Sequence, residues 1–201
     1  MISAITLSPQ NVEECFATLG ISQRFDHFEA SRIDPDKVVS PAGFFTFPTP
    51  RDNSELSILG LRRLVGVEPG PSPSFHRHPW YLEEPFGDTF CKPGWHSIAM
   101  NVTADSVGEP IQYADRLKEQ QLYLASAIEV VLMLFLHFAN TGKRLLSNCH
   151  TWTYNRTKEG RFVTVGAFGR NGVFVSSHEV GYQSRGLGIC PKIGPHRDSQ
   201  P

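Results

Sequence analysis

Residues 122–140 read LYLASAIEVVLMLFLHFAN, an almost continuous apolar stretch. At about 100° per residue its polar side chains share one narrow stripe of a helix; they are Ser126, Glu129, His137 and Asn140. A helix that is apolar on every other side is buried by the rest of its fold. Gly142 follows, and a glycine can end a helix in the left-handed conformation. The sequence therefore predicts a central core helix, which a more polar first portion extends to residues 113–141.

Glu129 lies near the middle of this stretch and decides how the stretch is interpreted. A membrane helix needs about 20 apolar residues, but an acidic side chain at the bilayer centre costs about 2.5 to 3.5 kcal/mol. We therefore expect a buried helix and no membrane span. Inside a domain, Glu129 either hydrogen-bonds to neighbouring elements or lines a polar cavity as an acid, base or ligand. It is a candidate catalytic residue.

The chain of 201 residues is long enough for one domain with a substantial core. Residues 2–7 predict a short strand and Ser8-Pro9 predicts the start of an early helix; a second short strand and a second helix follow within residues 1–66. Residues 149–190 alternate in polarity and contain turn signals at Gly160 and Asn171-Gly172, which predicts an antiparallel meander with a fourth strand near residues 182–190. The fold class expected is α+β, with the central helix packed on this carboxy-terminal sheet and residues 191–201 as a loose tail.

Residues 67–94 contain six prolines, which exclude a long helix. The same segment carries five large aromatic residues, too many for a free linker. We expect a long ordered loop, and such loops often carry function. The four cysteines show no paired spacing, and the first residues lack the basic start and apolar run of a secretory leader. These features predict reduced thiols and a cytoplasmic location.

A candidate metal site lies within and just after this loop. His76 and His78 leave an extended backbone on the same face, and Cys91 and His96 follow. Imidazole and thiolate are natural ligands of zinc, although the spacing matches no standard zinc motif. Loop histidines without a metal are the alternative. A zinc ion with an open position would activate water, and Glu129 or Glu83 would then be the base to consider.

The second candidate site is a basic sheet, since residues 1–140 carry a formal charge of −7 and residues 141–201 carry +6. Aromatic and basic side chains together bind anionic partners, including single-stranded nucleic acid, through stacking and phosphate contacts. The candidate residues are Trp152, Tyr154, Arg156, Lys158, Arg161, Arg170 and Arg185. The alternative is that the aromatic side chains belong to the core, because alternation is also typical of a strand packed on a helix.

Three functional hypotheses follow. The first is a protein without enzymatic activity that presents its basic sheet to an acidic protein or a nucleic acid. The second is a zinc-dependent hydrolase that uses the histidines and the cysteine of residues 76–96. The third is a structural subunit of a larger oligomeric assembly, which would also account for the apolar helix and the aromatic loop.

Overall fold

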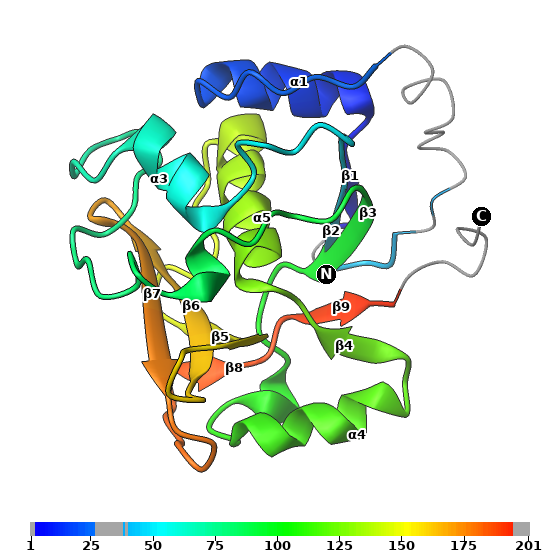
Figure 1. Ribbon diagram of the computed structural model, residues 1–201. Helices are drawn as coiled ribbons and strands as arrows, with labels where there is room; N and C mark the ends of the chain where they lie inside the picture. Colours follow the sequence, from blue (N-terminus) through cyan, green and yellow to red (C-terminus); the bar gives the residue numbers. More distant parts are fainter. Residues whose placement is uncertain (1–2, 27–37, 39, 195–201) are drawn as a thin grey trace.

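The computed structural model describes residues 3–26, 38 and 40–194. The fold is α+β, as predicted. Helix α5 (Ala127–Thr141) stands between two sheets, with β1, β2 and β3 on one side of it and β5, β6 and β7 on the other (Figure 1). A continuous hydrophobic core joins α5 to both sheets. The central position predicted for this helix is therefore confirmed.

The sequence around Ser126 fixes where α5 begins. The Ser126 hydroxyl accepts a hydrogen bond from the Glu129 amide, and the Glu129 carboxylate accepts one from the Ser126 amide at 2.7 Å, which makes a capping box. Every residue from Ala127 to His137 is buried. Gly142 ends the helix with a φ of 71°, a left-handed conformation that costs glycine little.

The first sheet contains β1 (Ile5–Thr6), β2 (Phe44–Thr49), β3 (Gly94–Ala99), β9 (Pro191–Ile193) and β4 (Leu122–Leu124) in that spatial order. The β1 and β2 strands pair in parallel, and the other neighbours are antiparallel. Helix α1 (Pro9–Thr18) starts at Ser8 with a capping box, as Ser8-Pro9 predicted. Together with α3 (Ile58–Val65), it packs against α5.

The second sheet contains β7 (Gly172–His178), β6 (Phe162–Gly169), β5 (His150–Arg156) and β8 (Leu187–Gly188) in that spatial order. Strands β5, β6 and β7 form the predicted antiparallel meander. The predicted fourth strand is only two residues long, and it pairs with β5 in parallel. Val163, Val165, Val173 and Val175 bury one face of the sheet in the core.

The prediction of one helix over residues 113–141 is wrong in its first portion. The chain forms the 3-10 turn η4 (Ile111–Tyr113) and the short helix α4 (Ala114–Lys118), and then the strand β4. Gln121 has a φ of 57°, which a helix cannot contain. Leu122 to Leu124 then pair with β9, so backbone pairing with a distant segment replaces local helix formation.

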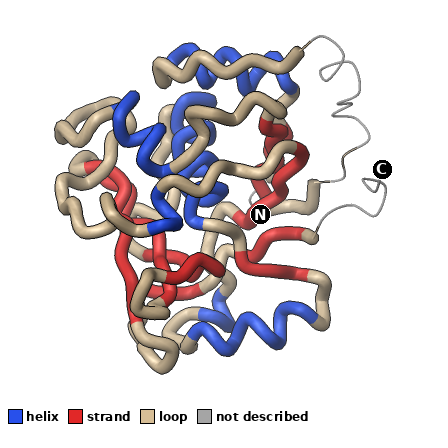
Figure 2. Tube along the Cα trace, in the orientation of Figure 1, coloured by secondary structure: helices blue, strands red, loops and turns tan. Residues whose placement is uncertain are grey.

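Residues 67–94 form the expected ordered loop, which includes the 3-10 turn η2 (Pro85–Gly87). The loop follows the edge of β7 before it returns toward α5 (Figure 2). Phe75 makes a parallel bridge with Val173, and the Trp80 indole donates a hydrogen bond of 2.7 Å to the Val175 carbonyl. At the far end, the Cys91 amide donates to the Leu56 carbonyl at 2.8 Å.

The chain crosses from the second sheet to the first over residues 187–193, where β8 is followed by β9. The prediction of a loose tail is therefore wrong for residues 191–193, and residues 195–201 lie outside the described part. The 3-10 turn η3 (Ala104–Ser106) contacts β8. Within the described residues, no helix has the length and apolar character needed to cross a membrane. All four cysteines are free thiols.

Candidate functional site

A buried polar cluster lies at the amino-terminal end of α5, where Glu129 meets His96 of β3 and Lys192 of β9. The His96 Nδ1 donates to Glu129 Oε1 at 3.1 Å, and Lys192 Nζ donates to the same oxygen at 2.5 Å. Glu129 is 3% exposed and His96 is 2% exposed. We refer to Glu129, His96, Lys192 and the neighbouring Cys91 as the Glu129 cluster.

The Glu129 carboxylate is ionised within this cluster. Burial by itself raises the pKa of Glu129, but the hydrogen bonds and charges of His96 and Lys192 outweigh burial and hold this pKa well below its usual range. The carboxylate also accepts from the Ser126 amide. Its two oxygens therefore have three donors, one from β3, one from β9 and one from the N-cap residue of α5 itself, and the first two join α5 to the first sheet.

The Cys91 thiol lies on the other side of the His96 ring. The Cys91 Sγ is 3.7 Å from His96 Nε2, and the Thr49 hydroxyl is 2.9 Å from the same nitrogen. Thiol, imidazole and carboxylate thus follow one another as they do in nucleophilic enzymes. However, Cys91 is only 1% exposed, and burial, together with the Glu129 charge, raises the pKa of its thiol. The Cys91 thiol is therefore a protonated group of the core. The Glu129 cluster connects the first sheet to α5.

The structure separates the four predicted zinc ligands into two places. Cys91 and His96 belong to the Glu129 cluster, whereas His76 and His78 lie beside β7, with ring centroids 4.7 and 6.4 Å from that of Phe174. The loop bonds to β7 near residue 76 and to Leu56, just before α3, at residue 91, which separates the two pairs. Within residues 3–26, 38 and 40–194, no three or more histidine, cysteine or acidic side chains are arranged to hold a metal ion.

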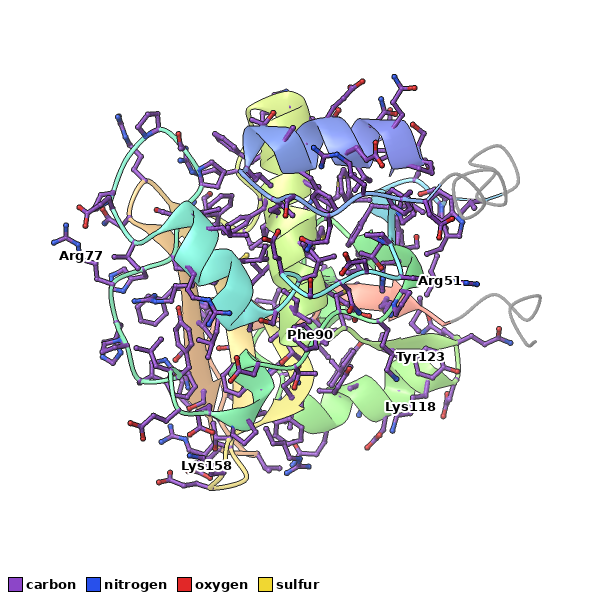
Figure 3. All side chains as sticks on the ribbon, turned by 45° about the horizontal axis from the view of Figure 1, so that its top comes forward. Arg51, Arg77, Phe90, Lys118, Tyr123 and Lys158 are labelled. Carbon is purple, nitrogen blue, oxygen red and sulfur yellow. The ribbon has the colours of Figure 1, made fainter. Side chains whose placement is uncertain are left out.

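The predicted basic residues do not share one surface. Arg156, Lys158 and Arg161 lie at the β5–β6 turn, and Lys158 extends from its tip (Figure 3). Arg170 lies at the β6–β7 turn, at the opposite end of β6, and Arg185 lies in the loop before β8. The guanidinium of Arg161 is 3.6 Å from the Glu179 carboxylate, which neutralises part of the charge at the first turn.

The two predicted aromatic residues of the sheet have different environments. Trp152 is fully buried and packs in a second hydrophobic cluster with Ile111 and Leu117, so the core interpretation holds for Trp152. Tyr154 is 49% exposed. Burial raises the pKa of Tyr154, and so does the Glu129 carboxylate, while a hydrogen bond to the Ser126 side chain lowers it. Tyr154 therefore has its hydroxyl directed toward the start of α5 while its ring remains accessible.

Tyr154 and Arg156 line a cavity of about 540 Å³ between α4, β4 and the β5–β6 hairpin. We refer to this cavity as the Arg156 pocket. Its apolar walls include Ile111, Ala114, Leu124, Phe162 and Val180. Lys118 and Tyr123, which also line it, extend from neighbouring parts of α4 and β4 (Figure 3).

The two basic side chains of the Arg156 pocket differ in their ion pairing. Lys118 Nζ lies 2.6 Å from Asp115, so these two groups neutralise one another. The Arg156 guanidinium lies over the Phe162 ring, 3.9 Å from its centroid, and donates one hydrogen bond of 3.2 Å to the Gly160 carbonyl. Among the described residues no carboxylate forms an ion pair with Arg156. The pocket thus holds one cation whose charge is not compensated.

Sequence reasoning found Tyr154 and Arg156 but missed the other wall of this pocket. Lys118 and Tyr123 fall in the portion that was predicted as helix, so nothing placed them opposite the sheet. Lys192 was assigned to a loose tail, and its contact with Glu129 depends on the pairing of β9. Comparison of the chain with protein-family models, with curated proteins and with solved structures found no match.

Proposed function

We propose that this protein binds a small anionic molecule with a flat apolar or aromatic body in the Arg156 pocket. The observation that carries the proposal is the Arg156 guanidinium, which Phe162 and Gly160 hold at the pocket wall without a carboxylate partner among the described residues. The proposal keeps the binding function and the anionic partner expected from the sequence, but assigns them to a pocket instead of a broad basic face.

The size and walls of the pocket support a small ligand. Ligand sites usually measure about 300 to 1,000 Å³ and combine mostly apolar walls with a few polar groups. The cavity of about 540 Å³ falls in this range. Tyr123 is 42% exposed and Tyr154 is 49% exposed, so both offer ring surface to a bound molecule. Aromatic rings favour a flat apolar body through stacking.

The state of Arg156 supports an anionic group on the ligand. An arginine side chain presents five N–H donors in a planar fork that matches a carboxylate or a phosphate. Only one hydrogen bond of Arg156 within the described residues uses this fork. The contact with Phe162 fixes the guanidinium plane before a ligand arrives, which reduces the entropy lost on binding.

The test uses phenyl phosphate as the probe and isothermal titration calorimetry as the measurement. An Arg156→Gln variant should lose about tenfold or more in affinity, since a hydrogen bond to a charged group contributes about 1.5 to 3 kcal/mol. The matched control is Arg170→Gln, which removes the same charge at the opposite end of β6 and should bind as the native protein does. Benzyl alcohol, which has a similar ring without the charge, should bind far more weakly. Equal affinities for phenyl phosphate in the native protein and in Arg156→Gln would refute the proposal.

A further inference from the structure

A second cavity, of about 340 Å³, lies on the face of the carboxy-terminal sheet that points away from α5. We refer to it as the His150 pocket. Its floor includes His150 of β5 with Phe174 and Ser176 of β7, and the loop after β7 forms its rim. Gly166 of β6 lies between His150 and Phe174 in the strand register. A side chain on this glycine would collide with the backbone of Cys149 and His150, so the glycine allows β5 to approach β6 closely here. The ring centroids of His150 and Phe174 lie 5.9 Å apart.

Several polar side chains of the His150 pocket form no hydrogen bond with the described residues, although Ser184 accepts one from the Gly186 amide at 3.3 Å. No hydrogen bond connects the side chains of Asn148, His150, Ser176 or His178 to other described residues. His150 Nε2 is also buried and has no partner in the described structure. Buried polar groups in native proteins are almost always hydrogen-bonded, because burying one without a partner costs about 1 to 3 kcal/mol. A bound molecule in this pocket would satisfy His150.

The side chains that line the His150 pocket carry no formal charge at neutral pH. None of the side chains that line it is acidic, and none is a lysine or an arginine. Burial lowers the pKa of His150, and the nearby His178 lowers it further. Burial also lowers the pKa of His178, with a smaller contribution from Arg161. Both rings are therefore neutral, and each then has one nitrogen that donates and one that accepts.

We infer that the His150 pocket binds a neutral, hydroxyl-rich molecule of the sugar class. Neutral imidazole, amide and hydroxyl side chains each donate and accept hydrogen bonds, as does every sugar hydroxyl. Phe174 adds an apolar surface against which the C–H face of a sugar ring would pack. A phosphate or carboxylate would find no lysine or arginine in the lining, and a metal ion would find no third histidine, cysteine or acidic ligand among the described residues. The His150 and Arg156 pockets share no lining residue, so this inference is independent of the proposed function.

The experiment titrates ¹⁵N-labelled protein with glucose, galactose, mannose and N-acetylglucosamine in turn, with adenosine as a neutral probe of another class. We expect at least one sugar to shift the amide signals of Gly166, Ser176 and Gly186, which line or adjoin the pocket. A His150→Phe variant keeps an aromatic ring at this position, removes both ring nitrogens, including the unpartnered Nε2, and should fold normally. It should bind that sugar about tenfold more weakly or worse, a change of about 1.4 kcal/mol.

The matched control is His76→Phe, which changes another histidine beside Phe174 that does not line the pocket. It should bind the sugar as the native protein does. The inference is overturned if no sugar in the panel shifts these amide signals, or if adenosine alone does so. Equal affinity of the native protein and His150→Phe for the sugar would overturn it as well.

Discussion

Replacing Glu129 with glutamine should destabilise the fold more than almost any other change of a single charge. The carboxylate accepts from His96, Lys192 and the Ser126 amide, and it is 3% exposed. Removing one member of a buried ion pair costs about 3 to 5 kcal/mol, because its partner stays buried without compensation. For a domain of this size, about 3 to 5 kcal/mol lowers Tm by roughly 6 to 20 °C. Glu159→Gln, at the exposed β5–β6 turn, is the matched control and should change stability by less than about 0.5 kcal/mol.

The measurement is urea unfolding followed by circular dichroism, for the native protein, Glu129→Gln, Lys192→Met and the double variant. Lys192→Met leaves the Glu129 carboxylate with His96 and the Ser126 amide as donors, so this variant should cost only about 1.5 to 3 kcal/mol. The double variant should cost less than the two single losses added together, with a coupling of about 0.5 to 3 kcal/mol. A Glu129→Gln variant within about 1 kcal/mol of the native protein would show that the cluster does not hold the fold together.

Lowering the pH should reduce the difference in the free energy of unfolding between the native protein and Glu129→Gln. The pKa of Glu129 is lower in the folded protein than in the unfolded chain, where it is about 4.3. The carboxylate therefore contributes its full stabilisation above about pH 4.3, and this contribution is lost as the pH falls toward the folded-state pKa. A difference that stayed constant from pH 7 down to pH 3 would contradict this assignment.

Three further predictions concern the start of α5, the start of β7 and the His150 pocket. Ser126→Ala removes the cap of α5 and should cost about 0.5 to 2 kcal/mol in urea unfolding; an unchanged midpoint would contradict the capping box. Gly172 has a φ of 88°, and a Cβ there would lie 2.7 Å from the His76 amide, so Gly172→Ala should destabilise by about 1 kcal/mol or more and expose the loop to limited proteolysis. The pKa values of His150 and His178 are lower in the folded protein than in the unfolded chain, so the unfolded chain binds more protons and stability should fall as the pH drops below about 6.5. In thermal unfolding, the Tm of His150→Phe should therefore fall less on acidification than the Tm of the native protein.

The parts of the fold that depend on local pattern could be predicted from the sequence. The apolar run gave the body of α5, and alternation with glycine turns gave β5, β6 and β7. The motif Ser126-Ala127-Ile128-Glu129 is a capping-box pattern and could also have located the start of α5. The strands β4 and β9 could not be found in this way, since each is three residues long and forms by pairing with a segment about 70 residues away.

The candidate sites were predicted in part. The polar stripe correctly drew attention to Glu129, and the metal hypothesis drew attention to Cys91 and His96, which do lie together. The spacing of the residues could not predict the path of the loop. Hydrogen bonds between the loop and β7 place His76 and His78 beside Phe174, away from Cys91 and His96. A pocket combines walls from distant segments, so neither cavity could be recognised before the tertiary structure.

The proposed binding function is tested most directly by locating phenyl phosphate on the protein. Titration of ¹⁵N-labelled protein should shift the amide signals of Lys118, Tyr123, Arg156 and Phe162 together, since these residues enclose the Arg156 pocket. Signals near Arg170 and Arg185 should stay in place. Shifts that instead spread over all the basic residues of the carboxy-terminal third, or that are absent from the pocket, would contradict the assignment of the site.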